Sequence, residues 1–136
     1  SQHKLLTSIP GIGDHTASTL LAEIGDLSLY AGARQLAAYA GLNPQGHRSG
    51  TSVRKKTRIS KQGRSELRCC LYMPAIVAMS HNPVVKDLND RMSERGSHKM
   101  EIVVAAMRKL LHIAYGVLKN QVPFDPHYGE QFNFSS

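Results

Sequence analysis

The sequence lacks the features that would place it in a membrane or in an oxidising compartment. It has no uninterrupted apolar run of about 18 residues, so no membrane span is expected. Its start, from Ser1 to Lys4, lacks the apolar core of a secretory signal. The two cysteines, Cys69 and Cys70, are adjacent, so they cannot staple the fold or match zinc-ligand spacing. These absences predict a cytoplasmic protein without disulfides, whose 136 residues form one small domain.

Carboxylates and histidines are not grouped as a metal site requires. Metal-dependent nucleases need carboxylates that converge on divalent cations, but the ten Asp and Glu residues are scattered. Asp87, Asp90 and Glu94 share one face of an expected helix, where interleaved Lys and Arg indicate an ion-paired surface. The seven His residues include no close ligand pair. We therefore expect no metal site in this chain.

One segment has no acidic residue at all. Seven of the 17 Lys and Arg residues lie between Leu42 and Ser65, and the other ten balance the ten Asp and Glu. The whole formal charge of +7 therefore belongs to this segment, which is also rich in Gly, Ser and Thr. Localised positive charge is typical of a surface that binds a polyanion. The basic residues are Arg48, Arg54, Lys55, Lys56, Arg58, Lys61 and Arg64.

Apolar residues recur with helical spacing through most of the remaining chain. The predicted helices cover about 5–9, 15–24, 33–40, 64–78, 83–95 and 99–118. Asp14 is the expected N-cap of the second helix, Pro74 is expected to kink the fourth, and glycines close several others. We therefore predict an all-α fold for residues 1–119, a small bundle of about six helices with one long basic loop. Residues 120–136 have no helical period and are expected to form a flexible tail.

The turn Pro10-Gly11-Ile12-Gly13 lies between two predicted helices. Helix, Pro-Gly-Ile-Gly turn and helix is the pattern of a helix-hairpin-helix motif. The backbone N–H groups of Gly11, Ile12 and Gly13 are expected to donate to a phosphate, next to a helix N-terminus that favours an anion. Such contacts position a duplex without reading its sequence. The alternative is a plain turn between two packed helices.

The basic loop also contains hydroxyl groups that are candidates for nucleophilic chemistry. Ser49 lies between Arg48 and Gly50, with further cations close behind it. A serine that attacks a phosphodiester needs cationic groups to stabilise the charged transition state. A loop that only binds phosphate would have the same composition. Residues 51–53 and 57–59 are candidates for a short hairpin.

Several motifs follow one another in a fixed order. They are Pro10-Gly11-Ile12-Gly13, Gly41-Leu42-Asn43-Pro44, Ser49-Gly50, Ile59-Ser60-Lys61-Gln62-Gly63, Leu67-Arg68 and Leu71-Tyr72-Met73-Pro74-Ala75. From about residue 5 to 119, the series resembles the C-terminal transposase domain of the insertion sequence 110/116/902 family. The resemblance implies a helix-hairpin-helix domain that carries a serine nucleophile for DNA, and that serine corresponds to Ser49. Ser52 and Ser60 remain rivals for this role.

The resemblance also implies partners and a part of the protein that this sequence lacks. Family members combine such a domain with an N-terminal RuvC-like domain, whose acidic residues bind divalent metal, with Mg²⁺ expected. They act on DNA with a bridge RNA as guide, and homo-oligomers are expected. No cofactor is expected in this fragment, which would depend on the missing domain for activity.

Two other functions are compatible with the sequence. The chain could be a non-catalytic module that binds nucleic acid without sequence preference, with a steep salt dependence. It could also be an assembly domain whose last helices form a dimer or tetramer interface.

Overall fold

The computed structural model describes residues 1–42 and 61–126, with the side chains of the second part described from Glu66 onwards. Within these residues the fold is all-helical, as predicted, and no strand is present. The elements are α1 (Gln2–Thr7), α2 (Asp14–Ile24), a 3-10 helix η1 (Leu27–Leu29), α3 (Ala33–Tyr39), α5 (Lys61–His81), α6 (Pro83–Glu94) and α7 (Lys99–Asn120). The hairpin predicted for residues 51–53 and 57–59 lies outside the described residues.

The helix boundaries follow local sequence signals with a few exceptions. Gly25, Gly41 and Gly96 have positive φ and follow the ends of α2, α3 and α6, as predicted. Asn82 caps α6 and is followed by a proline at the first helical position. The prediction for Asp14 is wrong. Gly13 occupies the N-cap of α2, Asp14 is the first helical residue, and no side chain caps this helix.

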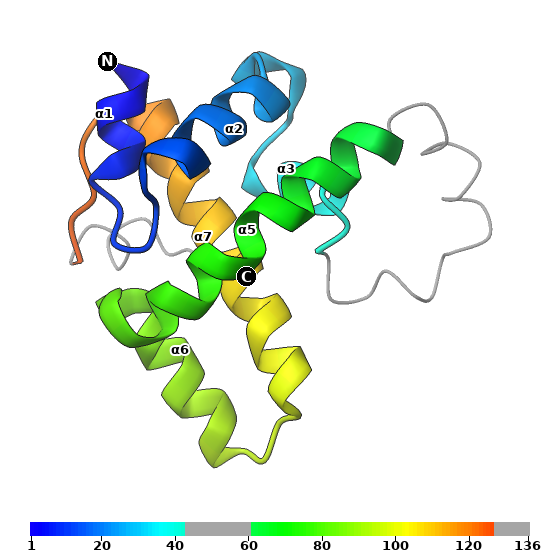
Figure 1. The fold of residues 1–136 in the computed structure, drawn as a ribbon, viewed down its shortest axis with the longest axis vertical. Helices are drawn as coiled ribbons and strands as arrows, with labels where there is room; N and C mark the ends of the chain where they lie inside the picture. Colours follow the sequence, from blue (N-terminus) through cyan, green and yellow to red (C-terminus); the bar gives the residue numbers. More distant parts are fainter. Residues whose placement is uncertain (43–60, 127–136) are drawn as a thin grey trace.

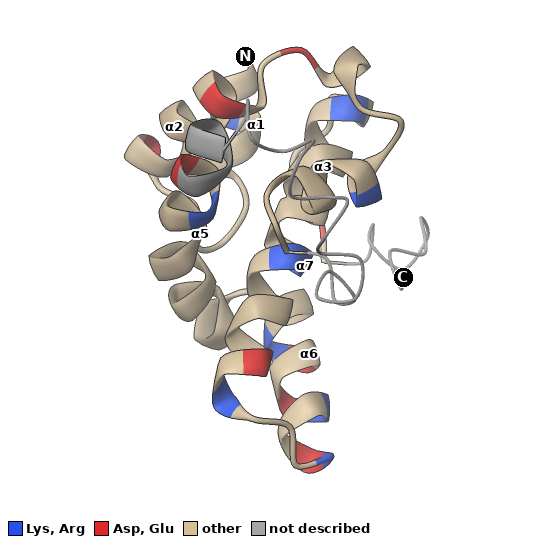
Figure 2. Ribbon diagram, turned by 90° about the vertical axis from the view of Figure 1, so that its right-hand side faces the viewer, with Lys and Arg blue, Asp and Glu red and all other residues tan. Residues whose placement is uncertain are grey.

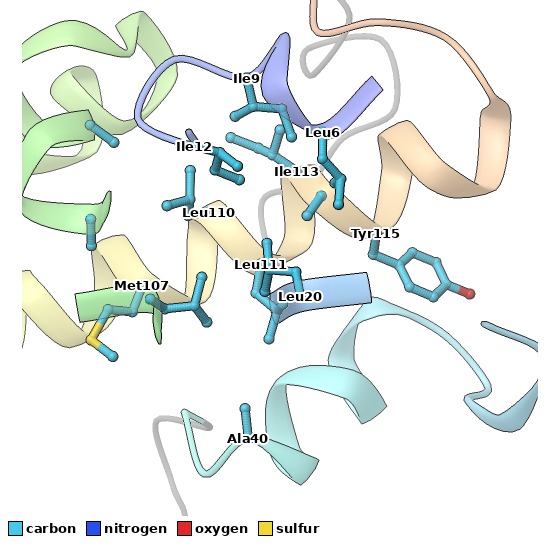
Figure 3. Packing of buried hydrophobic residues seen from close by; sticks show 14 of the residues in the cluster. Leu6, Ile9, Ile12, Leu20, Ala40, Met107, Leu110, Leu111, Ile113 and Tyr115 are labelled. Carbon is cyan, nitrogen blue, oxygen red and sulfur yellow. The ribbon is translucent and has the colours of Figure 1, made fainter. Parts of the chain in front are cut away.

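The long helix α7 forms the centre of the core. Residues 110–118 of α7 are buried at every position, because α1, α3, α5 and α6 all contact this helix. Figure 3 shows the side chains from the start of the chain lying over α7, with Ile9 beside Ile113 and Ile12 above Leu110. An interface formed by the last helix is therefore not available over this stretch, since the chain itself covers it.

Helix α5 crosses α7 and contacts α2 and α6 as well (Figure 1). It begins at Lys61, earlier than the predicted start at Arg64, and continues through Pro74 to His81. Apolar side chains of α5 are buried at Leu67 and Leu71, which helical spacing places on one face. The helix thus joins the end of the basic segment to the core.

The chain after α7 is partly fixed on α1. Asn120 still belongs to α7, so the predicted tail begins later than expected. The backbone N–H of Phe124 donates to Ser8 Oγ at 2.8 Å, and the Phe124 ring packs against the core. The chain is thus held on α1 at Phe124, the flexible tail stays a prediction, and residues 127–136 lie outside the description.

Charged residues of both signs alternate along α6 (Figure 2). Lys86 Nζ lies 3.4 Å from Asp90 Oδ2, and Arg91 Nε lies 3.0 Å from Asp87 Oδ2. These i,i+4 pairs confirm the predicted ion-paired surface. None of the described helices is both long and apolar enough to cross a membrane.

Candidate nucleic-acid interface

The α1–α2 turn gives different environments to its three predicted phosphate donors. The Ile12 N–H already donates to the Ile9 carbonyl at 3.0 Å, and the Ile12 side chain is buried. The prediction that Ile12 offers a free N–H to a phosphate is therefore wrong. Its role is to anchor the turn in the core.

Gly11 is half-buried and lies close against α5. It has φ of +107°, and a Cβ at this position would lie 3.0 Å from both the Ala78 Cβ and the Pro74 carbonyl oxygen of α5. Only glycine allows this close approach between the turn and α5. The Pro-Gly-Ile-Gly sequence is thus explained in part by packing.

Gly13 remains as the exposed member of the turn. A Cβ built there meets nothing within 4 Å, and no hydrogen bond within the described residues uses its N–H. Gly13 also precedes the free N–H groups of the first turn of α2, which attract anions. The exposed carboxylate of Asp14 lies beside it, so a phosphate must approach from the side away from Asp14.

Asn82 secures the turn from a distant part of the sequence. It is fully buried, its Nδ2 donates to the Pro10 carbonyl at 3.1 Å, and its Oδ1 accepts from the N–H groups of Val84 and Val85. One side chain therefore caps α6 and holds the turn. The Asn-Pro signal predicts the cap, but no sequence pattern predicts the bond to Pro10, which lies 72 residues away.

The basic segment is fixed at both ends by buried leucines. Leu42, at 1% exposed, and Leu67, at 0%, both belong to the hydrophobic core. Lys61 and Arg64 lie in the first turn of α5, where only the backbone is described. The other predicted site residues lie outside the described residues: Arg48, Ser49, Ser52, Arg54, Lys55, Lys56, Arg58 and Ser60.

A second group of basic side chains comes from α7 and α3 and was not singled out by the sequence. Burial lowers the pKa of His112 to about 4, with the positive charges of Arg108, Lys109 and Arg34 adding to the effect. Its imidazole is therefore neutral near pH 7. Among the described residues, Nε2 of this buried ring has no hydrogen-bond partner. Helical spacing brings Arg108 and His112 to one face of α7, but only the fold brings Arg34 to them.

Metal-binding groups do not converge in the described part of the chain. No three His, Cys, Asp or Glu side chains come together there. Cys69 is exposed and Cys70 half-buried, and burial raises the pKa of Cys70 to about 11, so its thiol stays protonated. The described residues thus provide no ligand set for a divalent ion.

Comparison with known proteins assigns the family. The model of the transposase IS116/IS110/IS902 family matches residues 3–90. The chain belongs to this family, and the resemblance inferred from its motifs is confirmed.

The relatives include proteins whose names describe DNA rearrangement. A pilin gene-inverting protein of Moraxella bovis is 45% identical over 127 residues, which cover 93% of this chain and 39% of the relative. The insertion element IS110 protein of Streptomyces coelicolor is 30% identical over 116 residues, which cover 85% of this chain and 28% of that protein. A transposase for insertion sequence element IS1111A of Coxiella burnetii is 38% identical over 86 residues, which cover 63% of this chain and 22% of that protein. The chain thus spans less than half the length of these relatives.

Proposed function

We propose that this chain is the C-terminal part of a DNA transposase or site-specific recombinase. It supplies a basic nucleic-acid-binding surface and a serine nucleophile for strand cleavage and exchange. The observation that carries the proposal is the acid-free segment of seven Lys and Arg residues, anchored in the core by Leu42 and Leu67. This chain is 45% identical over 127 residues to a protein named as pilin gene-inverting, and the inversion of a gene is a DNA rearrangement.

In the proposed reaction, the hydroxyl of Ser49 attacks a backbone phosphorus. A bond forms between Oγ and phosphorus while the bond from phosphorus to one sugar oxygen breaks. The serine proton is lost to a base, and the departing sugar oxygen takes up a proton. Arg48 and the cations at 54–58 stabilise the charge that develops on the phosphoryl oxygens.

The rest of the proposal concerns binding partners. The exposed Gly13 end of the α1–α2 turn contacts a duplex phosphate as a helix-hairpin-helix would, while Gly11 and Ile12 give it shape. The basic segment, with Lys61 and Arg64, holds DNA and a bridge RNA. A divalent ion, expected to be Mg²⁺, would be held by a domain outside this chain.

Replacing Ser49 with Ala in the full-length protein tests the catalytic role. We expect loss of strand exchange and of the covalent protein–DNA adduct, by about a thousandfold or more, because the nucleophile is removed. Ser52→Ala and Ser60→Ala are the controls and should retain both activities. If the adduct survives in Ser49→Ala and disappears in one of the controls, the serine replaced in that control is the nucleophile instead.

An oligomeric assembly is a second proposal, and α5 carries the observation that favours it. Tyr72, Met73 and Val77 are exposed large apolar side chains on one helix face, and residues 69–85 contain no Asp, Glu, Lys or Arg. Two copies of such an uncharged face can pack without burying a charge. Light scattering tests this surface: Met73→Glu should lower the association, and a strictly monomeric wild type at high concentration would contradict it.

A further inference from the structure

We propose that the cavity between α6, α7 and the end of α3 binds one unpaired nucleotide of a nucleic-acid strand. The base would lie against the methionines of the cavity, and the adjoining phosphate would lie at its two arginines. This inference rests on the proposed function, since it requires that the chain binds nucleic acid.

The cavity has the size and lining of a small-ligand site. Its volume is about 520 Å³, and most of its lining is apolar, including Leu42, Met92, Met100 and Val104. Sites for small ligands are usually concave and apolar, with few polar groups. The thioether of methionine is polarisable and makes favourable contacts with aromatic rings. Met100 is 58% exposed, so a flat base can reach its side chain without moving the core.

Two arginines at the cavity match the charge of a nucleotide. Arg95 is exposed at the end of α6, and Arg108 is half-buried on α7. Neither forms an ion pair with any residue that the structure describes. Guanidinium groups bind phosphate through paired N–H donors. A partner with only apolar side chains would cover Arg108 and leave its charge unpaired, which costs free energy.

The carboxylate at the cavity also fits a base. Glu101 Oε1 accepts from the backbone N–H of His98 at 3.1 Å, which fixes the side chain at the first turn of α7. Its other oxygen is an acceptor for an amino group on the edge of a base, as carboxylates are for cytosine. Ser97 adds a hydroxyl to the same lining.

The cavity lies where the basic segment leaves the core. Leu42 lines it and is the last described residue before the acid-free segment. Leu42 therefore places the cavity beside the start of that segment, and Arg95 and Arg108 line the same cavity. Bases of a single strand are free to enter a cavity, whereas a paired base must first leave the stack at a cost of a few kcal/mol. The site is thus selective for unpaired nucleotides.

Methionine methyl NMR on the 136-residue chain distinguishes a base in the cavity from contacts to phosphates alone. The probes are a single-stranded DNA oligonucleotide and the duplex of the same sequence. A base stacked on Met92 and Met100 shifts their methyl signals upfield through its ring current. We expect this shift with the single strand and not with the duplex. The methyl of Met73, which is exposed on α5, should not move with either probe.

A pair of alanine variants provides the matched binding test. Met100→Ala removes a cavity side chain that is 58% exposed, and Leu29→Ala removes one that is 72% exposed outside the cavity. We expect Met100→Ala to weaken single-strand binding by about three- to tenfold, as for loss of part of the contact to one base. Duplex binding by this variant, and all binding by Leu29→Ala, should match the wild type.

Each other outcome overturns the inference. If both probes bind while Met92 and Met100 stay unmoved, the cavity is empty and the proposed nucleic-acid binding still stands. If neither probe binds, the inference and the proposed function both fail. If the two methyl signals move only as protein concentration rises, the occupant is a second copy of the chain. If Met100→Ala weakens duplex and single-strand binding equally, the cavity does not select an unpaired base.

Discussion

At the scale of single residues, the two glycines of the α1–α2 turn have different requirements. Gly11 has φ of +107° and lies against α5, where a Cβ would come within 3.0 Å of two atoms. Gly13 has φ of −95° and open space around it. The first glycine is required by backbone conformation and packing. The second is exposed and has no such requirement.

Gly11→Ala should destabilise the fold by about 1–3 kcal/mol, through backbone strain and contact with Pro74 and Ala78. Gly13→Ala should change the free energy of unfolding by less than about 1 kcal/mol, since its backbone suits any residue and it is exposed. Urea unfolding of the two variants measures both values. Equal effects would show that the close approach of Gly11 to α5 does not constrain the fold.

His112 makes stability depend on pH in a definite direction. Its pKa is lowered in the folded protein to about 4, from an ordinary value of 6.5. As pH falls below 6.5, the unfolded chain takes up a proton that the folded chain refuses. The contribution of neutral His112 to the free energy of unfolding is therefore fully present above pH 6.5. It is lost progressively as the pH falls to about 4.

Replacing His112 with Leu should remove this part of the pH dependence. The wild type is expected to lose up to about 3 kcal/mol through His112 between the two pKa values, while His112→Leu should lose correspondingly less. His81→Leu removes an exposed imidazole and is the control for the substitution itself. Thermal unfolding at a series of pH values measures the difference. Parallel profiles for wild type and His112→Leu would contradict the assignment.

At the scale of elements, the corner between α5 and α6 supports the α1–α2 turn. Asn82 supplies the cap oxygen to α6 and an N–H donor to the Pro10 carbonyl. The same residue thus connects the candidate phosphate-binding turn to two long helices. A substitution at Asn82 is therefore expected to affect the α1–α2 turn, although the two are far apart in the sequence.

Asn82→Ser separates the two roles, because serine can cap a helix but is too short to reach Pro10. We expect a loss of about 1–3 kcal/mol in the free energy of unfolding, from the carbonyl left without a donor. Asn82→Ala should cost about 1 kcal/mol more, because the cap is also lost. Chemical unfolding of the two variants measures the increments. A serine variant as stable as the wild type would show that the bond to Pro10 contributes nothing.

The elements that sequence predicts well are those set by local signals. The apolar period of α7 and the glycines after α2, α3 and α6 depend only on neighbouring residues, and these predictions are confirmed. The hydrogen bond of the Ile12 N–H, the fit of Gly11 against α5 and the role of Asn82 depend on contacts made only in the fold. The candidate nucleophile Ser49 lies outside the described residues and remains a prediction from the family resemblance.

At the scale of the whole molecule, charge is divided between two kinds of surface. On α6, Lys86 and Arg91 are paired with acidic neighbours, so they attract a polyanion weakly. The segment between Leu42 and Ser65 holds seven Lys and Arg residues and no acid. The net charge of the protein does not distinguish these two surfaces. The salt dependence of DNA binding does, because only side chains that displace counterions from phosphates contribute to it.

The salt dependence of DNA binding should therefore depend on where the removed positive charges lie and not only on how many are removed. Replacing Arg54, Lys55 and Lys56 together with Ala should lower the slope of log affinity against log salt by roughly 2.7, if each neutralises one duplex phosphate. The control replaces Lys86, Arg91 and Lys99 with Ala, which removes the same charge from α6 and the start of α7. Its slope should match the wild type. Binding of a duplex over a range of salt concentrations measures both slopes. An equal reduction in the two variants would mean that the net charge, and not the basic segment, governs binding.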